Sequence, residues 1–214
     1  MKESTMLVIN DLIIRNTQFK SIEHNLTTAV NILIDSFKYG KKLLVCGNGG
    51  SAADALHIVG ELMKDFRIQR KIPSAVKREL EQMACEDSEL LIHNLQGALP
   101  AISLVSEIAL ETAYANDCDA ALSFAQQVLG YGREGDVLLC ISTSGNSNNV
   151  IYAAEIAKAM NIKVIALTGS SGGKLKAYCD CLINVPEEET YKIQEMHLPI
   201  YHSICIALEK EFFG

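Results

Sequence analysis

The segment LLVCGNGGS (residues 43–51) joins a short apolar run to a glycine-rich loop, and it decides the expected fold. The same order returns in VLLCISTSGNS (residues 137–147), where an apolar run leads into a loop of serines and threonine. Near-continuous apolar strands that alternate with helices are typical of a parallel sheet covered on both faces. Glycine lets the backbone approach an anion closely, and a following helix offers free N–H groups. The two loops together predict a ligand with a phosphate at one end and polar groups along its length.

The hydrophobic pattern places further elements around these loops. Apolar residues recur with a helical period between residues 11 and 38, ahead of the first strand. Such an amphipathic helix could cover the sheet or pack against other subunits. The remaining expected strands are 101–104, 164–168 and 182–185, and the expected helices are 51–66, 120–129, 148–160 and 190–212. A charged stretch at 71–99 is also expected to be helical.

Composition excludes several classes of protein. The chain has 214 residues, 49% of them hydrophobic, which suits a globular α/β protein with a full core. A formal net charge of −7 argues against nucleic-acid binding, which needs basic clusters. No apolar run is long enough to span a membrane, and no signal-peptide pattern appears, so a cytoplasmic location is expected. Seven cysteines, an odd number, predict reduced and mostly buried thiols.

Four polar residues on two distant helices form a possible chemical site. His57 and Glu61 are four residues apart, which puts both on one helical face. Gln194 and His202 are eight apart and so roughly 80° out of alignment on the last helix, which Pro199 should kink. The four side chains could hold one divalent metal or could provide an acid–base pair for a sugar. Alternatively, His57 bonds within the core, Glu61 is solvated and the C-terminal histidines pack at an interface.

The motifs taken together resemble the sugar isomerase (SIS) domain family, and more closely the phosphoheptose isomerases within it. The resemblance extends in order from the first helix to the C-terminus. The pieces that carry it are CGNGGS with Asp54, His57 and Glu61, then Asn116-Asp117, GDVLL (135–139), ISTSGNS (141–147), LTG (167–169) and IQEMH (193–197). Members of this family interconvert sedoheptulose 7-phosphate and D-glycero-D-manno-heptose 7-phosphate.

The resemblance implies a fold, an assembly and roles for particular residues. The fold would be a flavodoxin-like three-layer αβα sandwich, with residues 1–40 as a helical extension for oligomerisation and residues 41–214 as the SIS domain. The assembly would be a homotetramer that binds a small sugar phosphate. Glu61 and His202 would be catalytic, and His57, Glu61, Gln194 and His202 would bind zinc. The substrate would contact Asn48, Gly49, Gly50, Ser51, Asn116, Asp117, Ser142, Thr143, Ser144, Ser147 and Gln194.

A sister group offers a second reading. The DnaA initiator-associating proteins share the fold and the serine loop but lack the acidic residue and the last histidine of the site. This chain keeps both residues, Glu61 and His202, which favours an enzyme over a non-catalytic module that binds a sugar phosphate or a protein partner. Another SIS enzyme, such as a hexose phosphate isomerase or a sugar-phosphate lyase, is a third possibility.

Three departures from the family pattern bear on the substrate. Lys64-Asp65 stands where the family has a Gly-Arg pair, and Tyr191 stands where an aspartate is expected. The connection at 71–99 is longer than usual and could be a lid, an interface element or a specificity loop. A different heptose or ketose phosphate is therefore an open alternative.

Overall fold

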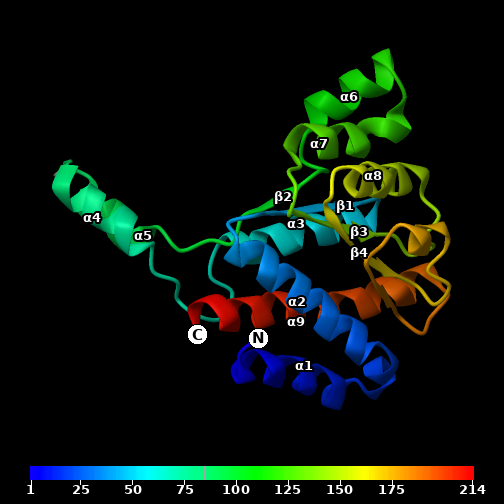
Figure 1. Cartoon of the computed structure of the whole chain (residues 1–214), viewed down its shortest axis with the longest axis horizontal. Coiled ribbons are helices and arrows are strands. Elements are labelled where there is room, and N and C mark those ends of the chain that lie inside the picture. The colour runs from blue at the N-terminus through cyan, green and yellow to red at the C-terminus, as the bar shows by residue number, and fades with distance from the viewer. Residues whose placement is uncertain (84) are drawn as a thin grey trace.

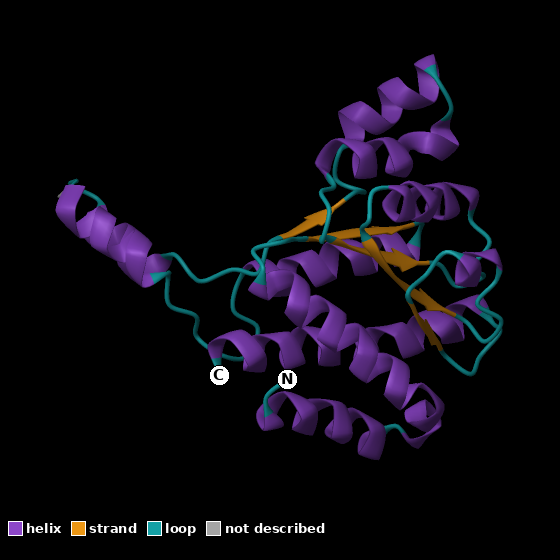
Figure 2. Ribbon diagram, in the orientation of Figure 1, coloured by secondary structure: helices purple, strands orange, loops and turns teal. Residues whose placement is uncertain are grey.

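The computed structural model describes residues 1–83 and 85–214 and contains a five-stranded parallel sheet between layers of helices (Figures 1 and 2). The strand order is β2-β1-β3-β4-β5, which is the flavodoxin-like order, so the predicted fold class is confirmed. The order reverses between β1 and β3, and ligands bind such sheets at that switch point. The strands are β1 (Leu43–Gly47), β2 (Ala101–Ser103), β3 (Val137–Ile141), β4 (Lys163–Thr168) and β5 (Cys181–Asn184).

The helices alternate with the strands along the chain, as the hydrophobic pattern predicts. They are α1 (Glu3–Arg15), α2 (Glu23–Lys38), α3 (Gly50–Met63), α4 (Ser74–Met83), α5 (Ser88–Asn94), α6 (Ile108–Asp117), α7 (Ser123–Tyr131), α8 (Asn148–Ala159) and α9 (Thr190–Phe213), with short 3-10 turns at Thr17–Ile22, Ala120–Leu122 and Lys174–Ala177. Helix α6 is not among the elements expected from sequence, and none of its residues is buried. Its surface therefore lacks the apolar stripe on which such an expectation depends.

Alternate residues of each strand face the two helical layers. Leu43 and Val45 of β1 join a core formed with α1, α2, α3 and α9, whereas Leu44 and Cys46 join a second core formed with α7 and α8. Burial on both faces explains why the strands read as continuous apolar runs. The seven cysteines are free thiols, and those of the apolar runs (Cys46, Cys140 and Cys205) are buried as expected.

The single N-terminal helix expected at 11–38 is two helices. The backbone of Asn16 leaves helical geometry with φ −135° and ψ 75°, and its side chain donates to the Leu12 carbonyl at the end of α1. Helix α1 then packs against α9, and α2 covers the sheet. The structure thus shows α2 covering the sheet, and a role of residues 1–40 in oligomerisation stays a prediction.

The long connection at 71–99 forms a helical hairpin that projects from the body (Figure 1). Helices α4 and α5 pack against each other, and no residue of α4 is buried. No helix in the described part of the chain combines the length and the apolar character needed to cross a bilayer.

Candidate active site

The two glycine- and serine-rich loops lie side by side at the carboxyl ends of β1 and β3, on either side of the switch point. Asn48 and Asn149 connect them, since each side-chain amide donates to the other's carbonyl oxygen at 2.9 Å. Gly49 has φ +57°, a left-handed conformation that favours glycine at the start of α3. The sequence motifs therefore meet in one place, as predicted.

The serine loop is held in shape by short-range hydrogen bonds. The hydroxyl oxygens of Ser142 and Ser147 are 3.3 Å apart. The Ser144 hydroxyl accepts from the backbone N–H of Asn146, and the Thr143 carbonyl accepts from Gly169 of the next loop at 2.9 Å. Ser142 and, on the first loop, Ser51 are buried, while Thr143 and Ser147 are half-buried and Ser144 is exposed. The hydroxyls thus surround a compact turn from which several can reach one anion.

A cavity of about 440 Å³ opens beside the first loop, large enough for a sugar phosphate. Asn48 and Gly49 line it on one side and Glu111 and Thr112 of α6 on the other. Burial raises the pKa of the Glu111 carboxyl.

Asn116 and Asp117 are not among the residues that line this cavity. They lie at the exposed end of α6, where the Asn116 amide donates to the Asp117 carboxylate at 2.8 Å. Their contact with a substrate stays a prediction.

Three of the four predicted zinc ligands come together between α3 and α9. His57 Nε2 is 3.1 Å from Glu61 Oε1 and 3.4 Å from His202 Nε2. Helix α9 continues through Pro199, and His202 still reaches His57 across the interface of the two helices. Burial and the neighbouring His57 lower the pKa of His202, against the opposing effect of Glu61. A neutral ring at position 202 is therefore available to accept a proton at neutral pH.

Gln194 and His197 take different positions from these three. The Gln194 amide packs over the Cα of Gly50, where any side chain at position 50 would collide with it. His197 is fully buried and its Nε2 lies 3.3 Å from the Thr168 carbonyl. Burial lowers the pKa of His197 to about 4, although the Thr168 carbonyl acts to raise it. His197 thus belongs to the core, while Gln194 joins α9 to the first loop.

The nitrogen and oxygen donors at this site are of the types that bind zinc, and the distances between the donor atoms are also suitable. A tetrahedral zinc ion, with bonds of about 2.0–2.1 Å, keeps its ligand atoms about 3.3 Å apart. A carboxylate oxygen and two imidazole nitrogens approach this closely only with a proton or a cation among them. Among the residues that the structure describes, Glu61 Oε2 also has no hydrogen-bond partner although it is buried. Across residues 1–83 and 85–214, however, no group of three or more His, Cys, Asp or Glu side chains already has metal-centre geometry.

Tyr201 and Asp54 support the cluster from behind, and the sequence motifs assigned them no role. The Tyr201 hydroxyl is 3.0 Å from His57 Nδ1 and donates to Asp54 Oδ1 at 3.2 Å. Burial raises the pKa of Asp54, while the Tyr201 hydrogen bond and His57 lower it. Spacing is the sequence feature that could have indicated both residues, because Asp54 lies about one helical turn before His57 and Tyr201 immediately precedes His202.

A buried ion pair fixes the end of α3 just beyond Glu61. Arg70 and Glu209 have no exposed side-chain surface and are 2.9 Å apart. Arg70 also donates to the carbonyls of Leu62 and Glu61, and Glu209 accepts the backbone N–H groups of residues 66, 67 and 68. The pair therefore connects α9 to the segment that leaves α3.

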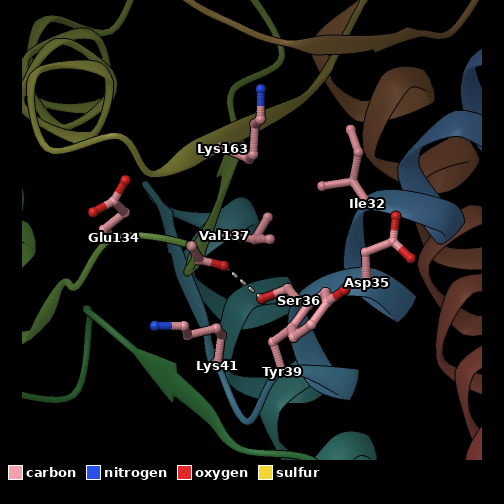
Figure 3. Close-up of a pocket in the computed structure, with 9 residues that line it drawn as sticks. Ile32, Asp35, Ser36, Tyr39, Lys41, Glu134, Val137 and Lys163 are labelled. Atoms are coloured by element: carbon pink, nitrogen blue, oxygen red, sulfur yellow. Dashed lines mark hydrogen bonds between the residues drawn. The ribbon is translucent and has the colours of Figure 1, made fainter.

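A second hollow of about 430 Å³ lies at the opposite edge of the sheet (Figure 3). Lys41, Val137 and Lys163 line it where strands begin, together with Asp35 and Tyr39 around the end of α2. Parallel sheets bind ligands at the carboxyl ends of their strands, so this hollow is not the candidate site.

Comparison with known proteins agrees with this geometry. The SIS domain family matches residues 12–90 and 91–169. A protein called phosphoheptose isomerase from Clostridium acetobutylicum is 42% identical over 185 residues, which is 86% of this chain and 81% of that protein. A protein of the same name from Nitratiruptor is 39% identical over 91% of this chain and 90% of its own length.

Solved structures give the same result. Phosphoheptose isomerase GmhA from Neisseria gonorrhoeae matches with a TM-score of 0.74 and 33% identity, over 94% of each chain. A phosphoheptose isomerase from Francisella tularensis matches with a TM-score of 0.75 and 32% identity, over 92% of this chain and 91% of that one. With the strand order, the paired loops and the His57–Glu61–His202 cluster in place, these matches show that the chain belongs to the phosphoheptose isomerase family of SIS domain proteins.

Proposed function

We propose that the protein is an aldose–ketose isomerase of a phosphorylated sugar, converting sedoheptulose 7-phosphate to D-glycero-D-manno-heptose 7-phosphate. The observation that carries the proposal is the meeting of His57, Glu61 and His202 beside two anion-binding loops. Isomerisation needs a base, a group that serves the oxygens, and a place for the phosphate. This site offers candidates for all three.

The loops bind and orient the substrate. Ser51 and the serine loop hold the phosphate and hydroxyl groups through their side chains and the N–H groups at the starts of α3 and α8, with Asn48 beside them. The Asn48–Asn149 pair keeps the two loops at a constant separation. Asn116 and Asp117 contact the sugar in this proposal, which requires α6 to approach the loops when substrate binds.

The proton transfers belong to Glu61 and His202. Glu61 removes the proton from the carbon next to the carbonyl group and returns it one carbon away, through an enediol. His202, neutral because its pKa is lowered, moves the proton between the two sugar oxygens. Arg70 holds the Glu61 carbonyl and so limits the movement of the base.

In this proposal His57, Glu61, Gln194 and His202 hold one zinc ion. Bound zinc would supply a Lewis acid that stabilises the negative charge developing on the sugar oxygens. Gln194, whose amide rests on Gly50 of the first loop, would supply the fourth ligand. We also propose that the active form is a homotetramer and that it works in the cytoplasm.

The test is an isomerase assay on sedoheptulose 7-phosphate with purified protein, with zinc added or chelated away. Zinc-dependent formation of the heptose 7-phosphate supports reaction, substrate and metal together. If the protein binds zinc but does not convert sedoheptulose 7-phosphate, its substrate is another sugar phosphate. If the protein neither binds zinc nor converts the substrate, the proposed enzyme activity is refuted and a binding module is favoured.

Glu61→Gln is the decisive variant, because it keeps the shape of the side chain and removes its basicity. We expect turnover to fall by about 10²-fold or more while the unfolding curve stays close to wild type. Glu81→Gln on the projecting hairpin is the matched control, since Glu81 is half exposed and pairs with Lys77 at 3.7 Å. Retained activity in Glu61→Gln would remove Glu61 from the mechanism.

A further inference from the structure

Tyr201 is a buried tyrosine whose hydroxyl connects α9 to two residues of α3. It is 2% exposed, and its oxygen lies 3.0 Å from His57 Nδ1 and 3.2 Å from Asp54 Oδ1. The three groups form a chain from a carboxylate to the inner nitrogen of a histidine. The outer nitrogen of that histidine faces Glu61 and His202.

When Asp54 is ionised, the hydrogen bonds from Asp54 through Tyr201 to His57 Nδ1 have one favoured direction. A carboxylate can only accept, and a tyrosine hydroxyl has a single proton to donate. Among the described residues, Tyr201 donates to Asp54 Oδ1, and the buried Oδ2 has no partner. A charged acceptor takes that proton in preference to a neutral imidazole. The Tyr201 oxygen then accepts, which requires a proton on His57 Nδ1. On the other side of the ring, Nε2 lies 3.1 Å from Glu61 Oε1, a contact that holds a second proton until a cation takes its place.

When a cation replaces the proton on Nε2, the ring keeps its proton on Nδ1 and offers the Nε2 lone pair, next to Glu61 Oε1 and His202 Nε2. We infer that Tyr201, held by Asp54, is a positioning residue that keeps His57 in its Nδ1–H tautomer, so that Nε2 can bind a divalent cation. Without the hydroxyl, Nδ1 would lack its partner and the ring could carry its proton on Nε2, where it would donate to Glu61. That arrangement blocks the cation and ties up the base.

The inference rests on the proposed function, since it gives His57 the ligand role named there. It goes further by identifying the group that orients the ligand and the direction of each proton. Partners of this kind fix tautomer and ring orientation, and their loss costs about 10–100-fold in metal affinity. A tyrosine placed there only for packing would be replaced by phenylalanine without such a loss.

The experiment uses Tyr201→Phe, which removes one oxygen and keeps the ring. Zinc alone is titrated into the metal-free protein in competition with a chromophoric chelator, and we expect its Kd to rise about 10–100-fold. In parallel, two-bond ¹H–¹⁵N correlation spectra of metal-free protein labelled at its five histidines report which ring nitrogen carries the proton. His57 is assigned by the signal that disappears in His57→Asn. Wild type should show Nδ1–H, and Tyr201→Phe should lose it.

Two further variants separate this role from a general loss of structure. Asp54→Asn should weaken zinc binding in the wild-type background, yet change it less than 2-fold in Tyr201→Phe, because the hydrogen-bonded route from Asp54 to His57 runs through the hydroxyl. Tyr39→Phe is the matched control, since Tyr39 is 81% exposed, and its zinc Kd should equal that of wild type.

The readouts distinguish failure of this inference from failure of the proposed function. A wild-type Kd in Tyr201→Phe, or a wild-type His57 ring that carries no proton on Nδ1, would overturn the inference even if the enzyme is active. If wild-type protein binds no zinc, the metal part of the proposed function fails. In that case the spectrum alone decides: Nδ1–H in wild type that is lost in Tyr201→Phe supports the role of Tyr201, and any other pattern overturns it.

Discussion

Replacing Glu209 by glutamine should destabilise the protein strongly, although the change is nearly isosteric. Glu209 and Arg70 have no exposed side-chain surface, so Glu209→Gln leaves the Arg70 guanidinium buried without a counter-charge. Removing one partner of a buried ion pair costs about 3–5 kcal/mol. The same carboxylate also accepts three backbone N–H groups, from Phe66, Arg67 and Ile68, and an amide carries fewer acceptor sites. The upper half of that range is therefore expected.

The measurement is urea unfolding monitored by circular dichroism, supported by thermal unfolding. For a chain of this size, a loss of about 4–5 kcal/mol lowers the Tm by about 8–20 °C. Glu81→Gln is again the control, because a surface pair contributes about 0–1 kcal/mol.

Replacing the pair by Arg70→Met with Glu209→Leu tests the cause of the loss. The double variant removes both charges but leaves the three N–H donors unsatisfied, so it should recover only part of the lost free energy. If Glu209→Gln costs no more than the surface control, the buried pair does not secure the end of α3.

Three other predictions follow from single features of the structure. The pKa of His197 is lowered to about 4 in the folded protein, so as the pH falls from 6.5 to 4 the unfolded chain binds more protons than the folded one. The free energy of unfolding should therefore decrease by up to about 3 kcal/mol over this interval. His197→Leu should flatten this part of the stability–pH curve, and an unchanged slope would contradict the assignment. Asn149→Ala removes the amide pair with Asn48, and we expect the KM for the sugar phosphate to rise about 5-fold with kcat nearly unchanged, measured against Asn94→Ala on the projecting hairpin; equal KM values in the two variants would show that the pair does not set the loop separation. Gly145→Ala should cost more stability than Gly40→Ala, because both have positive φ (63° and 68°) but only at position 145 would a Cβ collide with the Gly172 backbone; equal losses in urea unfolding would mean that the neighbouring loop yields freely.

The fold class was largely predictable because its signals are local. Residues 43–51 and 137–147 each carry strand, loop and helix start within one short segment, and both lie where expected. The break at Asn16 and the helix α6 were not predictable in this way. Helical periodicity continues across residue 16, and α6 has no buried stripe to mark it.

The sequence predicted which residues belong to the candidate site better than it predicted how they are arranged in space. Spacing put His57 and Glu61 on one face of α3, and their 3.1 Å contact confirms it. The approach of His202 could not be derived, because it depends on how α9 packs on α3 after Pro199. The zinc ion and the contacts of Asn116 and Asp117 with substrate stay predictions.

The strand–loop–helix units and the chemical types at the site follow from the sequence alone, since they depend on residues close together in the chain. Which distant groups meet depends on tertiary packing: Tyr201 with Asp54 and His57, and Arg70 with Glu209. These contacts join residues 139 to 147 positions apart. Their partners are selected by the burial of α9 against α3, where a polar group must find a hydrogen-bond partner or lose free energy, and no local pattern encodes that choice.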